Sequence, residues 1–84
     1  MSRLLNIGFG NFVNTEKILG IVLPDSAPAK RLIAHAKEDE TIIDATQGRK
    51  TKSVIITEGE RIILSALQPD TIAGRFNDAG KKGE

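Results

Sequence analysis

The chain contains no cysteine, tryptophan or tyrosine. Without cysteine, neither a disulfide nor a thiolate-bound metal can reinforce the fold. Without tryptophan and tyrosine, the core must be built from Ile, Leu, Val and Ala, together with three Phe residues. A single domain of 84 residues buries only a modest fraction of its surface. We therefore expect copies of this chain to associate and complete a thin core.

The sequence also lacks any apolar run that approaches the length of a membrane span. Residues 1–10 are too short and too polar for a signal peptide. These features predict a cytoplasmic protein with no membrane partner.

Charge of either sign is nearly balanced, with 12 Lys and Arg against 11 Asp and Glu, a net +1. Most nucleic-acid-binding domains carry a clearer positive excess. The signs are nevertheless separated along the chain, because acids gather at 38–40 and cations gather at 30–31 and 49–52. Such separation allows a nearly neutral protein to present one basic face.

Residue sets typical of an enzyme are absent from the sequence. His35, the only histidine, has no Ser, Cys or metal-ligating partner in a recognisable motif. Asp44 is a lone carboxylate, which we interpret as a turn-supporting acceptor or as an arginine partner. Gly8 and Gly10 form a G-x-G, but neither the third glycine nor the helix of a dinucleotide site follows. We expect no catalytic residue, no metal site and no cofactor.

The order of apolar runs and turn residues predicts an α+β fold. We expect a small twisted, mostly antiparallel sheet, one main helix and a short C-terminal helix. The helices are expected over 27–39, capped by Ser26 or Asp25, and over 70–76. Residues 3–76 form the single predicted domain, and 77–84 a disordered tail. The strands are expected over 3–7, 18–23, 42–46, 53–57 and 61–67, with a further short extended piece at 12–13.

Two of these strands, 42–46 and 53–57, flank a short polar segment that contains Gly48. Because glycine tolerates the positive φ of a tight reversal, this pattern predicts a hairpin. Three neighbouring cations near its tip repel one another and add nothing to a core, so they are candidates to bind an anion. They are Arg49, Lys50 and Lys52.

The run 18–23 is apolar at every position except Gly20. A run without alternation is typical of a central strand that is covered on both faces. Lys17 lies at its entry, where a cation reaches solvent, and Lys30 and Arg31 lie on the first helix. On sequence alone, each of these three reads most simply as a solvated charge.

Four segments of the chain closely resemble the RemA family, which are bacterial extracellular-matrix regulatory proteins. The resemblance extends over about residues 3–76. It implies a DNA-binding transcriptional regulator that activates biofilm-matrix genes. It also implies a closed homo-oligomeric ring with double-stranded DNA held against its basic outer surface. The four segments, in order, are 6–11 (NIGFGN), 26–31 (SAPAKR), 43–52 (IDATQGRKTK) and 63–69 (ILSALQP).

The resemblance also implies which residues contact DNA. The basic positions of the family correspond here to Lys17, Arg49 and Lys50, and the family has Arg at the first and third of them. Lysine keeps the charge but lacks the planar group that grips a phosphate through two hydrogen bonds. The tip offers few base readers, so phosphate positioning and DNA shape are expected to dominate. The remaining members of the predicted DNA-binding set are Lys52, Lys30 and Arg31.

One copy of this basic set would bind DNA weakly, because it offers only about three phosphate contacts. Linked copies bind in effect intramolecularly, which raises avidity by on the order of 10²–10⁴. A second class of function stays open on the sequence alone. In that alternative, the chain is a structural or protein-interaction module whose basic tip binds an acidic protein partner.

Overall fold

A computed structural model describes residues 3–82, and it has the α+β fold that the sequence predicts. Ser26 caps the main helix, as one of the two expected alternatives, since its Oγ accepts a hydrogen bond from the Ala29 amide. In chain order, the elements are β1 (Leu4–Asn6), β2 (Phe12–Asn14), a 3-10 turn η1 (Thr15–Lys17), β3 (Ile18–Val22), α1 (Ala27–Glu38), β4 (Ile42–Asp44), β5 (Ser53–Thr57), β6 (Ile62–Ser65) and α2 (Pro69–Lys82).

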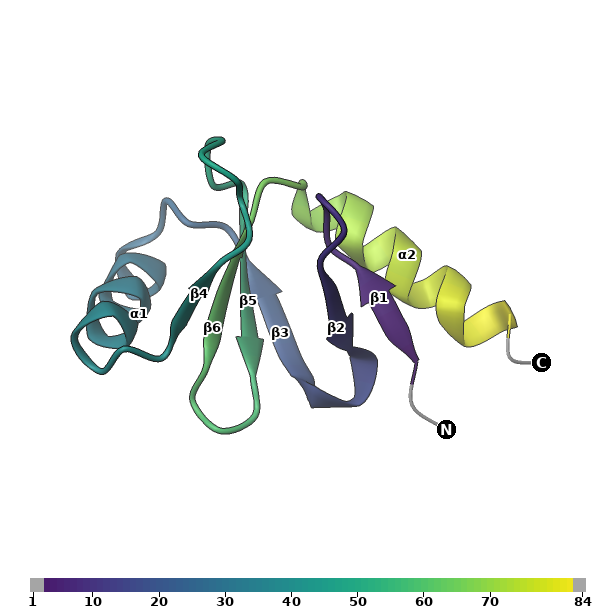
Figure 1. The fold of residues 1–84 in the computed structure, drawn as a ribbon, viewed down its shortest axis with the longest axis horizontal. Helices are drawn as coiled ribbons and strands as arrows, with labels where there is room; N and C mark the ends of the chain where they lie inside the picture. The colour runs from purple at the N-terminus through teal and green to yellow at the C-terminus, as the bar shows by residue number, and fades with distance from the viewer. Residues whose placement is uncertain (1–2, 83–84) are drawn as a thin grey trace.

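The strands form two sheets, shown in Figure 1. A four-stranded sheet has the order β3-β5-β6-β4, and β1 and β2 make a separate antiparallel pair. Strand β5 is antiparallel to both of its neighbours, whereas β4 runs parallel to β6. The prediction of mostly antiparallel pairing is therefore confirmed.

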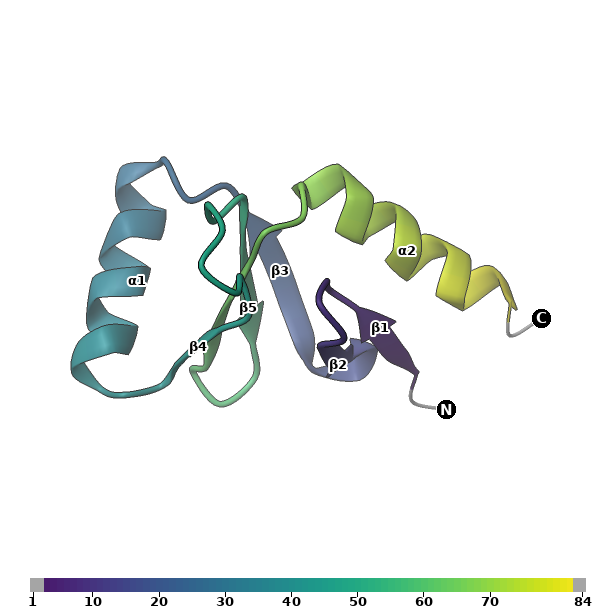
Figure 2. The same cartoon turned by 45° about the horizontal axis from the view of Figure 1, so that its top comes forward.

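The four-stranded sheet is covered on both faces, as Figure 2 shows most clearly. Successive residues of a strand point to opposite faces, and both Val54 and Ile55 of β5 are fully buried. Val54 packs with Leu64 and with Ala36 of α1 on one face. Ile55 packs on the other face with Ile72 of α2 and with residues of the β1–β2 hairpin. The central strands are thus β5 and β6, which are buried along most of their length.

The predicted hairpin between 42–46 and 53–57 is wrong. Strand β4 pairs with β6 through Ile42–Ile62 and Ile43–Ile63, and β6 lies between β4 and β5. Residues 45–52 are therefore a loop that crosses the end of β6. The physical reason is that β6 is buried along its length, so the backbone groups of both of its edges need partners, and β5 can pair with only one edge.

The prediction of a central strand over 18–23 is also wrong, because β3 is an edge strand. Leu19 is 67% exposed and Leu23 is 57% exposed. The run is apolar without being buried in one chain. Sequence periodicity cannot distinguish such an exposed apolar strand from a buried one.

The C-terminal helix is longer than predicted. It spans the 14 residues Pro69–Lys82, whereas the sequence predicts a short helix that ends at Phe76. No proline follows Pro69, so every later backbone amide can continue the helical hydrogen bonding past Phe76. The tail predicted over 77–84 overlaps α2 as far as Lys82, and its last two residues lie outside the described residues. Neither helix combines the length and apolar content that a membrane crossing requires within residues 3–82.

Candidate nucleic-acid interface

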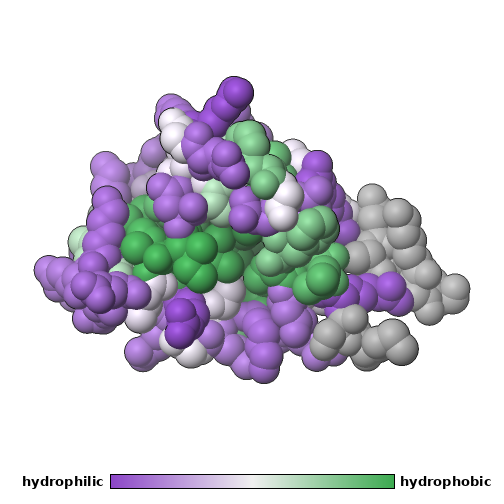
Figure 3. All heavy atoms as spheres, in the orientation of Figure 1, coloured by the Kyte–Doolittle hydropathy of each residue, from purple (hydrophilic) through white to green (hydrophobic). Residues whose placement is uncertain are grey.

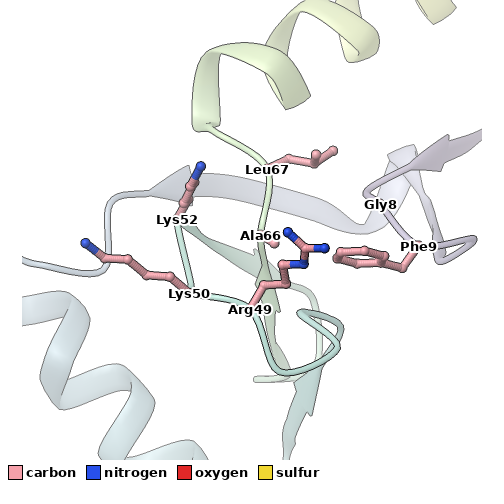
Figure 4. Close-up of a pocket in the computed structure, with 7 residues that line it drawn as sticks. All are labelled: Gly8, Phe9, Arg49, Lys50, Lys52, Ala66 and Leu67. Carbon is pink, nitrogen blue, oxygen red and sulfur yellow. The ribbon is translucent and has the colours of Figure 1, made fainter.

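Three segments that are distant in sequence meet at one end of the four-stranded sheet: the β1–β2 turn, the loop 45–52 and the connection from β6 to α2. Between them lies a hollow of about 410 Å³, drawn in Figure 4. We call it the basic hollow. Its cations are Arg49, Lys50 and Lys52, and its apolar lining comes from Phe9, Ala66 and Leu67, beside Gly8.

Two buried serines hold the walls of the basic hollow together. Ser53 and Ser65 are directly paired across β5 and β6, and both are fully buried. Ser65 Oγ donates to the Ile7 carbonyl at 2.8 Å and accepts from the Leu67 amide at 3.1 Å. Ser53 Oγ donates to the Leu67 carbonyl. The β1–β2 turn and the β6–α2 connection are thereby fixed to the same two strands.

Asp44 fixes the start of the loop 45–52, which carries the three cations. Its carboxylate accepts hydrogen bonds from Thr46 Oγ1 at 2.6 Å and from the Thr46 amide at 2.9 Å. The Thr46 carbonyl in turn accepts from the Arg49 amide at 3.0 Å. The hydrogen bond from the Thr46 hydroxyl is the main reason that the pKa of Asp44 is lowered, and the backbone amide and Lys37 act in the same direction. Asp44 is thus a turn-supporting acceptor, one of the two roles expected from the sequence.

Replacing Asp44 with alanine should destabilise the protein. Thr46 is 2% exposed, so its hydroxyl would lose its acceptor in a buried position. We expect the free energy of unfolding to fall by about 1–2 kcal/mol in urea denaturation at pH 7. The matched control is Asp25→Asn. The Asp25 side chain is exposed and takes part in no hydrogen bond within the described residues, so that variant should unfold like the wild type.

The hydrogen bonds between Asp44 and Thr46 also predict how the stability of the fold depends on pH. A carboxyl whose pKa is lower in the folded than in the unfolded chain stabilises the fold above its unfolded pKa. That contribution is lost as the pH falls through the folded pKa. The stability difference between the wild type and Asp44→Asn should therefore be constant above about pH 5 and shrink below about pH 4. A difference that grows on acidification would contradict the assigned role of Asp44.

The three cations of the basic hollow point in different directions, as Figure 4 shows. The Arg49 guanidinium carbon lies 5.9 Å from the centre of the Phe9 ring, a cation–π distance. Lys50 points to the opposite side, where a smaller hollow contains Asp25. Within the described residues, no carboxylate forms an ion pair with any of the three cations. Their charge is therefore available to an external anion.

The structure separates the other predicted DNA-binding residues from the basic hollow. Lys17 lies beyond the far end of β5, where its ammonium group is 3.3 Å from Glu58. At about 3.3 Å per strand residue, Lys17 and Lys52 are about 20 Å apart along the sheet. Lys30 and Arg31 are exposed on the first half of α1, and neither lines the hollow. Only Arg49, Lys50 and Lys52 are brought together in one chain.

Sequence reasoning missed the residues that complete this site. Ser53, Ser65 and Leu67 lie in the predicted strands 53–57 and 61–67, and no pattern in the sequence marks them or Phe9 as part of a site. One signal was present, because Ser53 and Ser65 border runs of Val, Ile and Leu. A hydroxyl next to a buried strand needs a hydrogen-bond partner, which points to a neighbouring backbone segment.

The arrangement offers charge, one aromatic ring and a fixed apolar floor. No group of three or more acidic, histidine or cysteine side chains is placed to hold a metal ion within residues 3–82. The fold and the site therefore define a small α+β protein with a basic, partly apolar hollow on its surface.

The chain belongs to the RemA-like family, described as extracellular matrix regulatory protein A-like, whose model matches residues 4–76. This confirms the resemblance drawn from the sequence. A relative from Alkaliphilus metalliredigens is 54% identical over 84 residues, covering 98% of this chain and 90% of the relative. A relative from Symbiobacterium thermophilum is 55% identical over 74 residues, covering 88% of this chain and 78% of the relative. A relative from Clostridium kluyveri is 49% identical over 82 residues, covering 98% of this chain and 89% of the relative. All three are named as regulatory proteins.

Proposed function

We propose that the protein is a DNA-binding transcriptional regulator of extracellular-matrix genes, and that its basic hollow binds the phosphate backbone of double-stranded DNA. The observation that carries this proposal is the set of three cations without an ion-pair partner on a rigid, partly apolar surface. Family membership supports the regulatory role. A regulator of bacterial genes meets its DNA in the cytoplasm, so the proposal also places the protein there.

We further propose that the protein acts as a closed ring of identical subunits. Large apolar side chains stay exposed in one chain, notably Leu4 at 70% and Phe12 at 57% on the β1–β2 hairpin, Leu19 on β3 and Ile43 at 45% on β4. Figure 3 shows apolar atoms gathered over β4 and over the β1–β2 hairpin. Exposed apolar area of this kind marks an interaction surface. The two edge strands, β3 and β4, also leave backbone groups available for pairing.

A ring would turn a weak site into a strong one. Three phosphate contacts contribute a log–log salt slope of about 2.7 for one subunit. Identical subunits in one assembly add their contacts, and each later contact forms intramolecularly. The predicted contributions of Lys17, Lys30 and Arg31 belong to this assembled state, because a single chain does not bring them to the hollow.

Salt-dependent binding of the wild type to duplexes of increasing length tests the proposal. We expect affinity to rise with duplex length and the slope to exceed clearly the value of about 2.7 that one subunit supports. Native mass spectrometry of the same samples gives the number of subunits. A monomeric mass together with a slope below about 3 would contradict the ring.

The second outcome of this experiment concerns the alternative class of function. If the wild type fails to retard any duplex at about 50 mM salt, where phosphate contacts are strongest, the DNA-binding proposal is wrong. Specific capture of an acidic protein partner by the same surface would then favour the interaction-module alternative.

A further inference from the structure

Phe9 stands out because its position is costly for the fold. It lies at the tip of the β1–β2 turn with a φ of 54°, in the left-handed region that bulky side chains rarely adopt. Its side chain is 46% exposed and lies outside both core clusters. A strained backbone that presents a half-exposed aromatic ring is a reason to look for a function.

The turn that carries Phe9 is held firmly in place. The Asn6 side chain accepts from the Gly8 amide at 2.8 Å, and the Asn11 side chain donates to the Gly8 carbonyl at 3.0 Å. Gly8 itself lies against Leu67, and an added Cβ would come within 3.4 Å of that side chain. The ring is therefore presented at a fixed place on the rim of the basic hollow.

The Phe9 ring faces Arg49 across the hollow, and Figure 4 shows both side chains beside the apolar floor. A cation and an aromatic face placed together match an anion that carries an adjoining apolar group. A nucleotide has this chemistry, because the phosphate is anionic and the edge of the sugar is largely apolar. An inorganic phosphate ion lacks the apolar part.

We propose that Phe9 is a further nucleic-acid contact, whose ring packs against the sugar next to the phosphate bound by Arg49. This inference rests on the proposed function. The proposed Phe9 contact carries no charge. Its loss should therefore lower affinity without changing the salt slope, unlike the loss of a lysine or the arginine.

Phe9→Asn tests the contact without straining the fold, because asparagine is enriched at positive φ. We expect duplex affinity to fall by at least fivefold, the log–log salt slope to stay unchanged, and the melting temperature to stay within about 5 °C of the wild type. Phe9→Leu, which keeps apolar bulk but loses the ring face, should also weaken binding at least threefold. Phe9→Tyr restores the ring and should bind within twofold of the wild type.

A second experiment tests with small ligands whether the Phe9 ring recognises the sugar beside the phosphate. In NMR titrations, the wild type should prefer a deoxynucleoside monophosphate to inorganic phosphate, and Phe9→Asn should lose that preference. The inference is overturned if Phe9→Asn or Phe9→Leu binds duplex like the wild type, if their salt slope falls, or if wild type and Phe9→Asn do not differ in this preference. Absence of duplex binding by the wild type is a separate result, and it overturns the proposed function first.

Discussion

Arg49→Ala combined with Lys50→Ala leaves the fold intact and reduces duplex affinity by about a hundredfold or more. Both side chains are exposed and form no ion pair within the described residues, so their loss removes little from the folded state. Each lost phosphate contact lowers the log–log salt slope by about 0.9, or by about 1.8 for each engaged subunit of the double variant. Fluorescence anisotropy across a salt series measures both quantities.

The matched control removes two positive charges elsewhere. Lys37→Ala with Arg61→Ala changes the net charge by the same amount, and neither residue lines the basic hollow. Long-range attraction to DNA is reduced equally in both variants. If the control loses as much affinity as the Arg49 and Lys50 variant, general charge explains binding and the hollow is not the DNA surface. Native mass spectrometry checks that both variants keep the subunit number of the wild type.

The sequence was most informative where one local rule decides the structure. The main helix was predicted within one residue of its observed end at Glu38, because Ser26 caps it and Ala29 and Ala36 face the sheet. The predicted strand 53–57 coincides with β5, and the gap before the predicted strand 61–67 contains the turn at Gly59 that joins β5 to β6. These features depend on a few neighbouring residues, so the chain itself contains the information.

Strand partners were harder to predict because pairing is decided far along the chain. Ile42–Asp44 contains nothing that distinguishes an antiparallel partner at 53–57 from a parallel partner at 62–64. Burial of β6 between two strands settles the matter, and burial is a property of the whole sheet. The apolar run of β3 misleads for a related reason, because apolar composition does not show whether a residue such as Leu19 is buried or exposed.

The candidate site was predicted in part. Arg49, Lys50 and Lys52 are close in sequence and stay close in space, so a run of cations was sufficient to find them. Phe9 and Leu67 reach the same hollow only through the tertiary fold. Lys17 belongs to the predicted set through the family resemblance. Within one chain it lies about 20 Å from Lys52 along the sheet, so it is separate from the other three cations.

Ser65→Ala should have the largest effect on stability among the polar substitutions near the site. Its hydroxyl makes two hydrogen bonds in a fully buried position, so the variant leaves the Ile7 carbonyl and the Leu67 amide without their partner. We expect a loss of about 2–3 kcal/mol in the free energy of unfolding, because unsatisfied buried groups keep their full desolvation cost. For a domain of this size, this corresponds to a fall in melting temperature of roughly 10–20 °C.

Ser53→Ala is the matched control, since this serine faces Ser65 across the same strand pair but makes one hydrogen bond. It should cost about 1 kcal/mol. Equal losses from the two variants would show that the second bond of Ser65 contributes nothing. Amide hydrogen exchange supplies an independent measure, because the Leu67 amide is bonded to Ser65 and should exchange faster only in Ser65→Ala. Faster exchange there would mean that a core hydroxyl keeps the apolar wall of the basic hollow in position.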